Sequence, residues 1–527
     1  MSPLPVSEYR GSGAVAVTPH HLATEAALSV MREGGNAADA VIAANAVLGT
    51  VLPTTCGVGG DLFAIVHRPG MEAPEVLNAS GRGGSGLDAD ALRAGGLKAI
   101  PRRSPESITV PGCVDGWEAL AGRHGSRNLA RLLAPAISLA EDGFEVSKEL
   151  ADDLVRIEGV VAGQDPARAL YPGGSPPPPG TVLRRPDLAG TLGAIATEGR
   201  HAFYSGRVAA AIVAATDGVL AAADLEANRP DWVPALGADL FGLRAWTVPP
   251  NSQGYLTLAA ATLFEALDAD PDPADPAFHH ALIEAYRAVA WERDLLVSDP
   301  STAPMDPSEL LDRARLLPRI RRISDHGVSR WAAPRRLPGG TAYFCAVDPS
   351  GMAVSCIQSN FTGIGSGIGA TGTGVFLHNR GAGFTLEQGH PNEATPGKRP
   401  MHTLSPTLWT RCDSVAMLLG TRGGDQQPQY LLQMAALILA AGLSPPEAQR
   451  SWRWHAEGRN RYRSVLSCEL GVPEEVVAGL RARGHAVESG PGLRPGWGPV
   501  SVVAVAPDGT RWAAADPRVG TASAGGT

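Results

Sequence analysis

Gly339-Gly-Thr-Ala-Tyr-Phe-Cys-Ala-Val-Asp-Pro-Ser-Gly-Met-Ala-Val-Ser-Cys-Ile-Gln-Ser-Asn360 is the stretch around which the fold of this chain is organised. Residues 342–348 and 352–359 are rich in β-branched, aromatic and small apolar side chains. The Asp348-Pro-Ser-Gly351 tetrapeptide between them is a turn signal. The pattern therefore predicts a β-hairpin with Thr341 at the start of its first strand.

Thr341 follows two glycines, which let the backbone bend tightly so that a nucleophile can approach the Gly340 carbonyl. The Thr341 hydroxyl could attack that carbonyl, and water could then cleave the resulting ester. The new chain would begin at Thr341, and its free α-amine could act as the base for its own hydroxyl. An ordinary strand-initial threonine after a glycine loop is the alternative that these residues alone leave open.

Composition narrows the class of protein. The chain has 527 residues, 44% of them hydrophobic, and a formal charge of −8. It shows no basic stripe with interleaved aromatic residues, so we expect no nucleic-acid partner. The apolar run Met434–Leu443 is too short to span a bilayer and is expected to be a buried helix. The amino terminus lacks the apolar core of a secretory signal, and the sequence therefore predicts a soluble, cytoplasmic protein without a membrane partner.

Cysteines and histidines give no sign of a metal or cofactor. The six cysteines form no C-x-x-C pair, and the thirteen histidines show neither H-E-x-x-H nor an i, i+4 pair. The glycine loop Cys56–Asp61 follows a helical pattern and lacks the Lys-Ser/Thr of a phosphate-binding loop. We therefore expect no metal, no cofactor and a small-molecule substrate.

Several segments frame the central hairpin. Helices are predicted over His21–Glu33 and Ala37–Leu52, and another through Leu431–Leu443. The glycines of Gly420–Asp425 precede this last helix and could supply an oxyanion site, although they could equally be a plain helix entry. Residues 317–338, rich in arginine and proline, are expected to form an exposed linker or a solvated face.

These motifs together resemble the γ-glutamyltransferase family of N-terminal nucleophile hydrolases, in the family's order and over nearly the whole chain. The matching segments are Glu33-Gly-Gly-Asn-Ala-Ala-Asp-Ala40, Pro53-Thr-Thr-Cys-Gly-Val-Gly-Gly60, Phe203-Tyr-Ser-Gly206, Pro249-Pro-Asn-Ser252, His280–Ala285, Asp299-Pro300, Gly340-Thr341, Lys398-Arg-Pro400, Leu404-Ser-Pro-Thr407, Gly423-Gly424 and Ala515-Asp-Pro-Arg518.

The resemblance implies an α/β fold, a four-layer αββα sandwich. It also implies cleavage between Gly340 and Thr341 into a large chain, 1–340, and a small chain, 341–527, which stay associated. By the same resemblance Thr341 is the nucleophile, and the Gly423 and Gly424 N–H groups form the oxyanion hole. Ser359 falls where the family has an assisting threonine.

The sequence departs from the family where γ-glutamyl donors are held. The expected arginine near Asn78 is displaced or replaced in the loop that ends at Arg82. A segment that usually offers carboxylates to the donor ammonium reads Asn379-Arg-Gly-Ala-Gly-Phe384, and a serine pair is replaced by His402-Thr403. Losing that carboxylate should leave a buried ammonium without its partner, so glutathione is a doubtful substrate.

The segments 358–367 and 379–384 instead resemble the acylase-like branch, which contains glutaryl-type cephalosporin acylases and small-amide hydrolases. Arg380 could then bind an acyl carboxylate bidentately, or it could be a surface arginine. The residues expected to contact substrate are Arg380, Asn360, His402, Thr403 and Arg82.

Four functions remain open from the sequence. The leading one is a self-processing hydrolase or acyltransferase that cleaves an amide with a small or carboxylate-bearing acyl group. The others are a γ-glutamyl transferase with an altered donor pocket, a C–C bond hydrolase of alkylproline-type secondary metabolism, and an unprocessed, non-catalytic binding protein.

Overall fold

The predicted hairpin lies at the centre of the molecule. The computed structural model describes residues 5–337, 339–457, 463–490, 492 and 495–527. Strand β10 (Gly340–Val347) pairs antiparallel with β11 (Ala353–Phe361). The turn between them closes with a 2.9 Å hydrogen bond from the Gly351 N–H to the Asp348 carbonyl. The hairpin prediction is therefore confirmed.

Two seven-stranded sheets lie face to face. The hairpin sheet has the order β21-β2-β10-β11-β3-β4-β7, and the second sheet has the order β1-β20-β19-β15-β14-β9-β8. The remaining strands of the hairpin sheet are β21 (Ser523–Gly526), β2 (Val15–Thr18), β3 (Asp61–His67), β4 (Glu75–Ala79) and β7 (Asp231–Pro234). The strands of the second sheet are β1 (Glu8–Gly11), β20 (Arg511–Ala514), β19 (Val500–Val505), β15 (Ser414–Thr421), β14 (Thr407–Arg411), β9 (Leu243–Thr247) and β8 (Leu236–Leu240).

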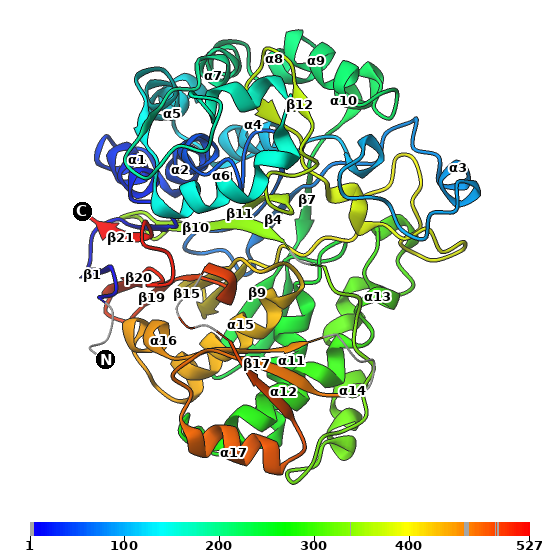
Figure 1. Cartoon of the computed structure of the whole chain (residues 1–527). Coiled ribbons are helices and arrows are strands. Elements are labelled where there is room, and N and C mark those ends of the chain that lie inside the picture. Colours follow the sequence, from blue (N-terminus) through cyan, green and yellow to red (C-terminus); the bar gives the residue numbers. More distant parts are fainter. Residues whose placement is uncertain (1–4, 338, 458–462, 491, 493–494) are drawn as a thin grey trace.

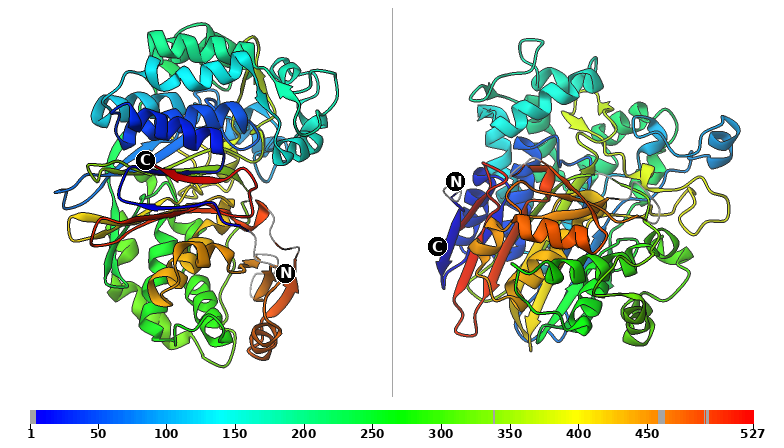
Figure 2. Two further views of the ribbon diagram at one scale, coloured as in Figure 1. Left: turned by 90° about the vertical axis from the view of Figure 1, so that its left-hand side faces the viewer. Right: turned by 60° about the horizontal axis from the view of Figure 1, so that its bottom comes forward.

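Helices cover the outer face of each sheet (Figures 1 and 2). Above the hairpin sheet in Figure 1 lie α1 (His21–Arg32), α2 (Ala37–Val51), α4 (Cys113–His124), α5 (Leu129–Asp142), α6 (Lys148–Val161), α7 (Pro186–Glu198), α8 (Arg200–Tyr204), α9 (Arg207–Ala215) and α10 (Ala222–Ala227). Below the second sheet lie α11 (Tyr255–Leu267), α12 (Pro276–Ala290), α15 (Gln427–Ala435), α16 (Pro445–Arg450) and α17 (Glu474–Ala482). Helices α3 (Ala89–Ala94), α13 (Arg293–Leu296) and α14 (Arg313–Leu316) lie at the side.

Three apolar cores fill the spaces between these layers. Strand β10 contributes side chains to two of them. Its residues 342, 344 and 346 belong to the core shared with the upper helices. Residues 343, 345 and 347 belong to the core between the two sheets. Alternate side chains of a strand point to opposite faces, so one strand contributes to both cores. With a third core between the second sheet and the lower helices, the fold is the predicted four-layer αββα sandwich.

The first two predicted helices are confirmed to within one residue at their ends. The helix predicted through Leu443 is shorter, because α15 ends at Ala435 and a single π-turn, Ala436–Ala440, follows it. Gly442 has φ +72°, a left-handed conformation that ends a helix at its carboxyl side.

The stretch before Thr341 is partly exposed, as its composition suggested, but it is anchored to the protein at several points. Trp331 is 4% exposed and Leu337 is 3% exposed. The Arg335 guanidinium donates to the carbonyls of Gly383 at 2.8 Å and Phe384 at 3.2 Å. The arginines of this stretch include anchors that bind backbone carbonyls, which is why the segment is held against the protein.

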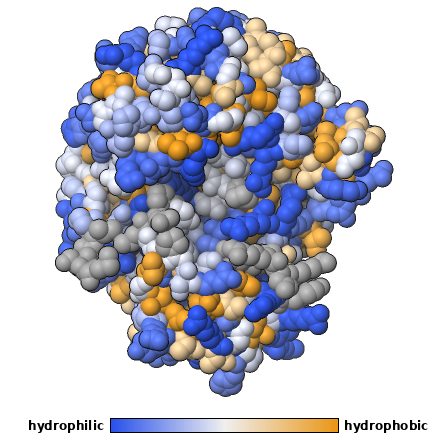
Figure 3. Space-filling model, viewed as in Figure 1, coloured by the Kyte–Doolittle hydropathy of each residue, from blue (hydrophilic) through white to orange (hydrophobic). Residues whose placement is uncertain are grey.

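Apolar residues on the face drawn in Figure 3 occur in small groups dispersed among hydrophilic ones. Among the helices of the described ranges, none combines the length and the apolar character that crossing a membrane requires.

Candidate active site

Thr341 and Ser359 lie together at one end of the hairpin. On β10, the odd-numbered residues 343, 345 and 347 belong to the core between the sheets, and Thr341 is also odd-numbered. On β11, residues 353 and 357 belong to the same core, and Ser359 is an odd-numbered residue of that strand. Gly340 pairs with Phe361 and Ala342 with Gln358, with a bulge between them. Strand alternation therefore brings both hydroxyls to one face of the hairpin sheet, where Thr341 is 2% exposed.

A short hydrogen-bond chain links the proposed nucleophile to the carbonyl before it. The Thr341 hydroxyl donates to Ser359 Oγ at 3.2 Å. Ser359 Oγ in turn donates to the Gly340 carbonyl at 2.5 Å and accepts from the Phe361 N–H at 2.8 Å. The arrangement offers a path for the Thr341 proton and polarises the Gly340 carbonyl for attack.

The two predicted oxyanion glycines lie beside this peptide. Gly423 has φ +134° and Gly424 has φ +61°, conformations that favour glycine. A Cβ built on Gly339 would lie 3.2 Å from Gly424 Cα, so the backbones pass close to each other. The N–H groups of Gly423 and Gly424 take no part in the loop and turn hydrogen bonds of the described residues. They can therefore bind a developing oxyanion.

Arg380 is not a surface residue, because it is only 1% exposed. It begins the 3₁₀ turn Arg380–Gly383, and its guanidinium lies 3.9 Å from the centre of the Phe361 ring. Nη1 donates to Thr403 Oγ1 at 3.4 Å, whereas Nε and Nη2 have no hydrogen-bond partner among the described residues. Burial lowers the pKa of Arg380 to about 9. Two unused donors on a buried cation are able to bind an anion, and the role of Arg380 in substrate binding stays a prediction.

His402 uses both ring nitrogens within the protein. Its Nε2 lies 3.1 Å from Asp61 Oδ2, and its Nδ1 accepts from the Leu404 N–H at 3.4 Å. Burial lowers the pKa of His402 to about 3, so the ring is neutral. Both ring nitrogens of His402 are therefore engaged within the protein, and its direct contact with substrate stays a prediction.

Asp61 is a site residue that the sequence reasoning missed. It is fully buried and accepts from the Gly81 N–H at 3.0 Å, while His378 Nδ1 lies 3.4 Å from its other oxygen. Burial by itself would raise the pKa of Asp61, but His378 and His402 keep it below its ordinary value. In the sequence, the only sign of a role for Asp61 was its position directly after the glycines of the Cys56–Asp61 loop.

Asn360 braces the glycine loop that precedes Asp61. Its Nδ2 donates to the Pro53 carbonyl at 3.3 Å, and Oδ1 is buried without a partner in the described chain. The neighbouring Gln358 bonds both the N–H and the carbonyl of Gly57, each at 2.8 Å. The loop thus packs against β11.

Arg82 faces a different set of partners. Its guanidinium lies 3.5 Å from carboxylate oxygens of both Asp231 and Asp299 and donates to the Gly397 carbonyl at 3.1 Å. None of these groups bonds Thr341 or Arg380. A role of Arg82 in substrate binding therefore stays a prediction.

A cleft of about 660 Å³ opens at Gly339 and Gly340, within the range of small-molecule sites. One wall is the first half of α6, and the other contains Arg422, Gly423 and Gln426. Its lining includes four arginines (103, 156, 336 and 422) and four carboxylates (149, 152, 153 and 425). Ion pairing of Arg422 with Glu149 at 2.5 Å joins the two walls. Positive and negative side chains are therefore balanced in the lining of this cleft.

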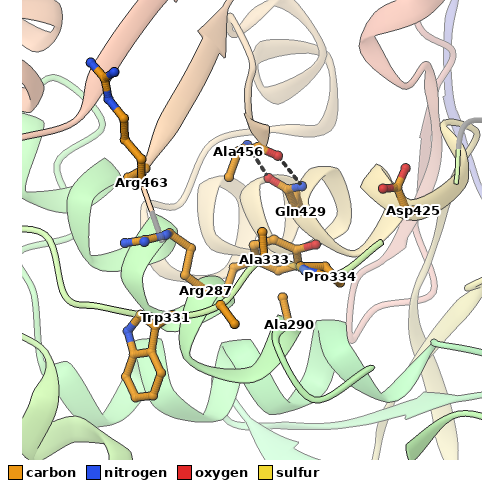
Figure 4. Close-up of a pocket in the computed structure, with 12 residues that line it drawn as sticks. Arg287, Ala290, Trp331, Ala333, Pro334, Asp425, Gln429, Ala456 and Arg463 are labelled. Atoms are coloured by element: carbon orange, nitrogen blue, oxygen red, sulfur yellow. Dashed lines mark hydrogen bonds between the residues drawn. The ribbon is translucent and has the colours of Figure 1, made fainter. Parts of the chain in front are cut away.

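A smaller cavity lies beside Trp331, Pro334 and Asp425 (Figure 4). Gln429 also lines this cavity and exchanges two hydrogen bonds with the Ala456 backbone, which Figure 4 shows as dashed lines. Its volume of about 30 Å³ is room for one or two waters, so it is not a substrate site.

The αββα sandwich with a strand-initial hydroxyl residue at its centre is the architecture of the N-terminal nucleophile hydrolases. The gamma-glutamyltranspeptidase family profile matches residues 23–526, and the chain belongs to that family.

Relatives in this family match essentially the full length. The glutathione hydrolase-like YwrD proenzyme of Bacillus subtilis is 33% identical, over 98% of this chain and 99% of that protein. The oxamate amidohydrolase proenzyme of Klebsiella pneumoniae is 35% identical, over 97% of this chain and 98% of that protein. The crystal structure of a cephalosporin acylase from Bacillus halodurans superimposes with a TM-score of 0.92 at 30% identity, covering 100% of this chain and 97% of that one.

Proposed function

We propose that this protein is a self-processing amide hydrolase whose nucleophile is Thr341. The observation that carries the proposal is the hydrogen-bond chain from the Thr341 hydroxyl through Ser359 to the Gly340 carbonyl. It joins a nucleophile, a proton acceptor and an electrophilic carbonyl in one buried array. Relatives named as proenzymes, among them the oxamate amidohydrolase, support it.

Self-cleavage would begin with attack of Thr341 Oγ on the Gly340 carbonyl carbon. The hydroxyl proton passes to Ser359, and the proton of Ser359 stabilises the carbonyl oxygen. When the Gly340–Thr341 C–N bond breaks, the departing nitrogen takes a proton and becomes the α-amine of Thr341. Water then hydrolyses the ester, which leaves a carboxylate on Gly340 and the free hydroxyl on Thr341.

The same hydroxyl would then act on a substrate amide. The α-amine of Thr341 takes the hydroxyl proton, and Oγ attacks the substrate carbonyl. The N–H groups of Gly423 and Gly424 stabilise the oxyanion. Collapse of the tetrahedral intermediate expels the amine and leaves an acyl ester on Thr341, which water hydrolyses.

The two products, 1–340 and 341–527, would stay together because they share both sheets. In the hairpin sheet, β10 of the small chain pairs with β2 of the large chain, and β11 pairs with β3. In the second sheet, β14 pairs with β9 and β20 pairs with β1. In the hairpin sheet β21 of the small chain also pairs with β2. Separation would break these five ladders and expose all three cores.

We propose further that the substrate is an amide with a small or carboxylate-bearing acyl group. The free Nε and Nη2 donors of Arg380 suit the two oxygens of a carboxylate. A γ-glutamyl donor carries an ammonium, and Arg380 occupies the segment where a carboxylate would have to meet it. This charge pattern favours carboxyacyl amides over glutathione.

The test compares intact masses of the wild type, Thr341→Ala and a control, Thr410→Ala, which alters another buried strand threonine. We expect the wild type and the control to yield chains of 1–340 and 341–527 and Thr341→Ala to remain one chain. Amides of oxalate, glutarate and acetate and a γ-glutamyl anilide are then assayed with the processed protein. A wild type that stays whole, or a Thr341→Ala protein that is cleaved, would contradict the proposal.

A further inference from the structure

Gln253 lies directly after the Pro249–Ser252 motif and before α11, and it is fully buried. Its backbone N–H donates to the His402 carbonyl at 3.0 Å. This contact fixes its backbone beside the His402-Thr403 pair.

The Gln253 side chain binds two separate parts of the candidate site. Its Nε2 donates to the Thr403 carbonyl at 3.2 Å and to the Gly424 carbonyl at 3.1 Å. A carboxamide nitrogen has two N–H groups, so one side chain satisfies both carbonyls. No other residue among those described has a side chain that bonds both backbone carbonyls.

Each of these carbonyls belongs to a residue with a proposed role. Gly424 supplies an N–H to the oxyanion hole, and its φ of +61° is one of several that a glycine can adopt. Thr403 carries the hydroxyl that accepts from Arg380. Gln253 therefore sets the distance between Gly424, which would stabilise the transition state, and Thr403, which contacts the Arg380 that would recognise the acyl group.

Arg293 holds the Gln253 amide in the required orientation. Arg293 is fully buried, and its Nη1 donates to Gln253 Oε1 at 3.4 Å. Asp294 Oδ1 accepts from Arg293 Nε at 3.0 Å and from Nη2 at 2.9 Å. Because Arg293 can only donate, it directs the amide oxygen towards itself and the amide nitrogen towards the two carbonyls.

We propose that Gln253 is a positioning residue that ties Gly424 of the proposed oxyanion hole to Thr403, the partner of Arg380. This inference rests on the proposed function, because it needs an acyl transfer to Thr341. Without Gln253 the Gly424 carbonyl would keep the Gln427 N–H as a partner but would lose its link to Thr403, so the glycine backbone could shift. The oxyanion donors would then lie outside the geometry that the transition state requires.

The chain offers a matched control in Gln433. It is 3% exposed, and its Nε2 donates to the carbonyls of Gln429 at 3.0 Å and Trp454 at 2.8 Å. Its Oε1 accepts from the Trp454 N–H at 3.1 Å. Gln433 thus makes the same kind and number of bonds on α15, away from Thr341.

The experiment compares Gln253→Met with Gln433→Met, because methionine keeps the volume and removes the donors. Both proteins are first checked for cleavage at Thr341, and rates are expressed per processed chain. We expect kcat of Gln253→Met to fall about 30- to 100-fold on every amide that the wild type hydrolyses. Its preference for a carboxyacyl amide over the neutral amide should also fall, whereas Gln433→Met keeps the wild-type kcat and preference.

Gln253→Glu is the second variant, because its carboxylate can pair with Arg293 but faces two carbonyl oxygens. It should fold and lose at least as much kcat. The inference is overturned if Gln253→Met and Gln433→Met have the same kcat, or if both Gln253 variants fail to fold while Gln433→Met folds. A wild type without amidase activity would instead refute the proposed function, and the two failures are distinguishable.

Discussion

Replacing Arg380 with methionine should make the protein more stable and less able to recognise its substrate. The free protein buries a guanidinium that has one hydrogen bond, at 3.4 Å, and two unused donor atoms. Removing a buried charge that lacks a close partner can stabilise a fold by about 1–4 kcal/mol. The cation–π contact with Phe361, 3.9 Å from the ring centre, offsets about 2 kcal/mol of that gain because it is desolvated.

The expected loss of activity on a carboxylate-bearing substrate follows from removing the same two donors, Nε and Nη2 of Arg380. Hydrogen bonds to charged groups contribute about 1.5–3 kcal/mol each, so two of them are worth about 3–6 kcal/mol. Every 1.4 kcal/mol is tenfold, which predicts a fall of about 100- to 10,000-fold in kcat/KM for a carboxyacyl amide. An acyl group without a charge makes no such bonds, so kcat/KM for a neutral amide should change less than about threefold.

The assay is kcat/KM on an isosteric pair of amides, one with a terminal carboxylate and one with a neutral terminus. Unfolding is followed in urea on the uncleaved Thr341→Ala background, where a single chain is present. Arg185 is the control, because it is 4% exposed and all three of its hydrogen bonds, at 2.9–3.0 Å, go to backbone carbonyls. Arg185→Met should therefore destabilise the fold without changing the preference. An Arg380→Met protein with the wild-type ratio of the two rates would refute the assignment of the carboxylate subsite.

Ser359→Ala removes the donor to the scissile Gly340 carbonyl, so self-cleavage should slow about 10- to 100-fold. The fraction of intact chain is measured against time, and cleavage at the wild-type rate would contradict the role of Ser359. Glu149→Gln breaks the ion pair with Arg422, which directly precedes Gly423 and Gly424. We expect kcat to fall about 3- to 10-fold while KM stays within twofold. An unchanged kcat would show that the pair does not position these glycines. Burial lowers the pKa of His485 to about 3, so the unfolded chain binds a proton below pH 6.5 that the native chain does not. Stability is therefore lost as the pH falls, by about 2 kcal/mol from this residue at pH 5. On the Thr341→Ala background, urea unfolding of His485→Gln should show a correspondingly smaller loss between pH 7 and 5, and an identical pH dependence would contradict the shift.

The sequence by itself determined the centre of the fold. Two runs of β-branched, aromatic and small apolar residues around a turn signal predicted the β10–β11 hairpin. Residues 342–347 supply two cores because alternate positions of a strand face opposite ways. The glycines at 423 and 424 marked a backbone with unusual conformations. These features are local, so periodicity and turn chemistry are enough to reveal them.

Only the tertiary structure decided which groups have partners. Nothing in the sequence near Arg380 shows that it is buried with two unused donors, since burial depends on Phe361 and Thr403. The carboxylate of Asp61 meets His402 across 341 positions of sequence, and Gln253 reaches Gly424 across 171. The stretch before Thr341 appeared exposed from its composition, although its arginines bind carbonyls brought to them by other segments. Long-range pairing sets burial and charge, and these quantities decide the chemistry of the site.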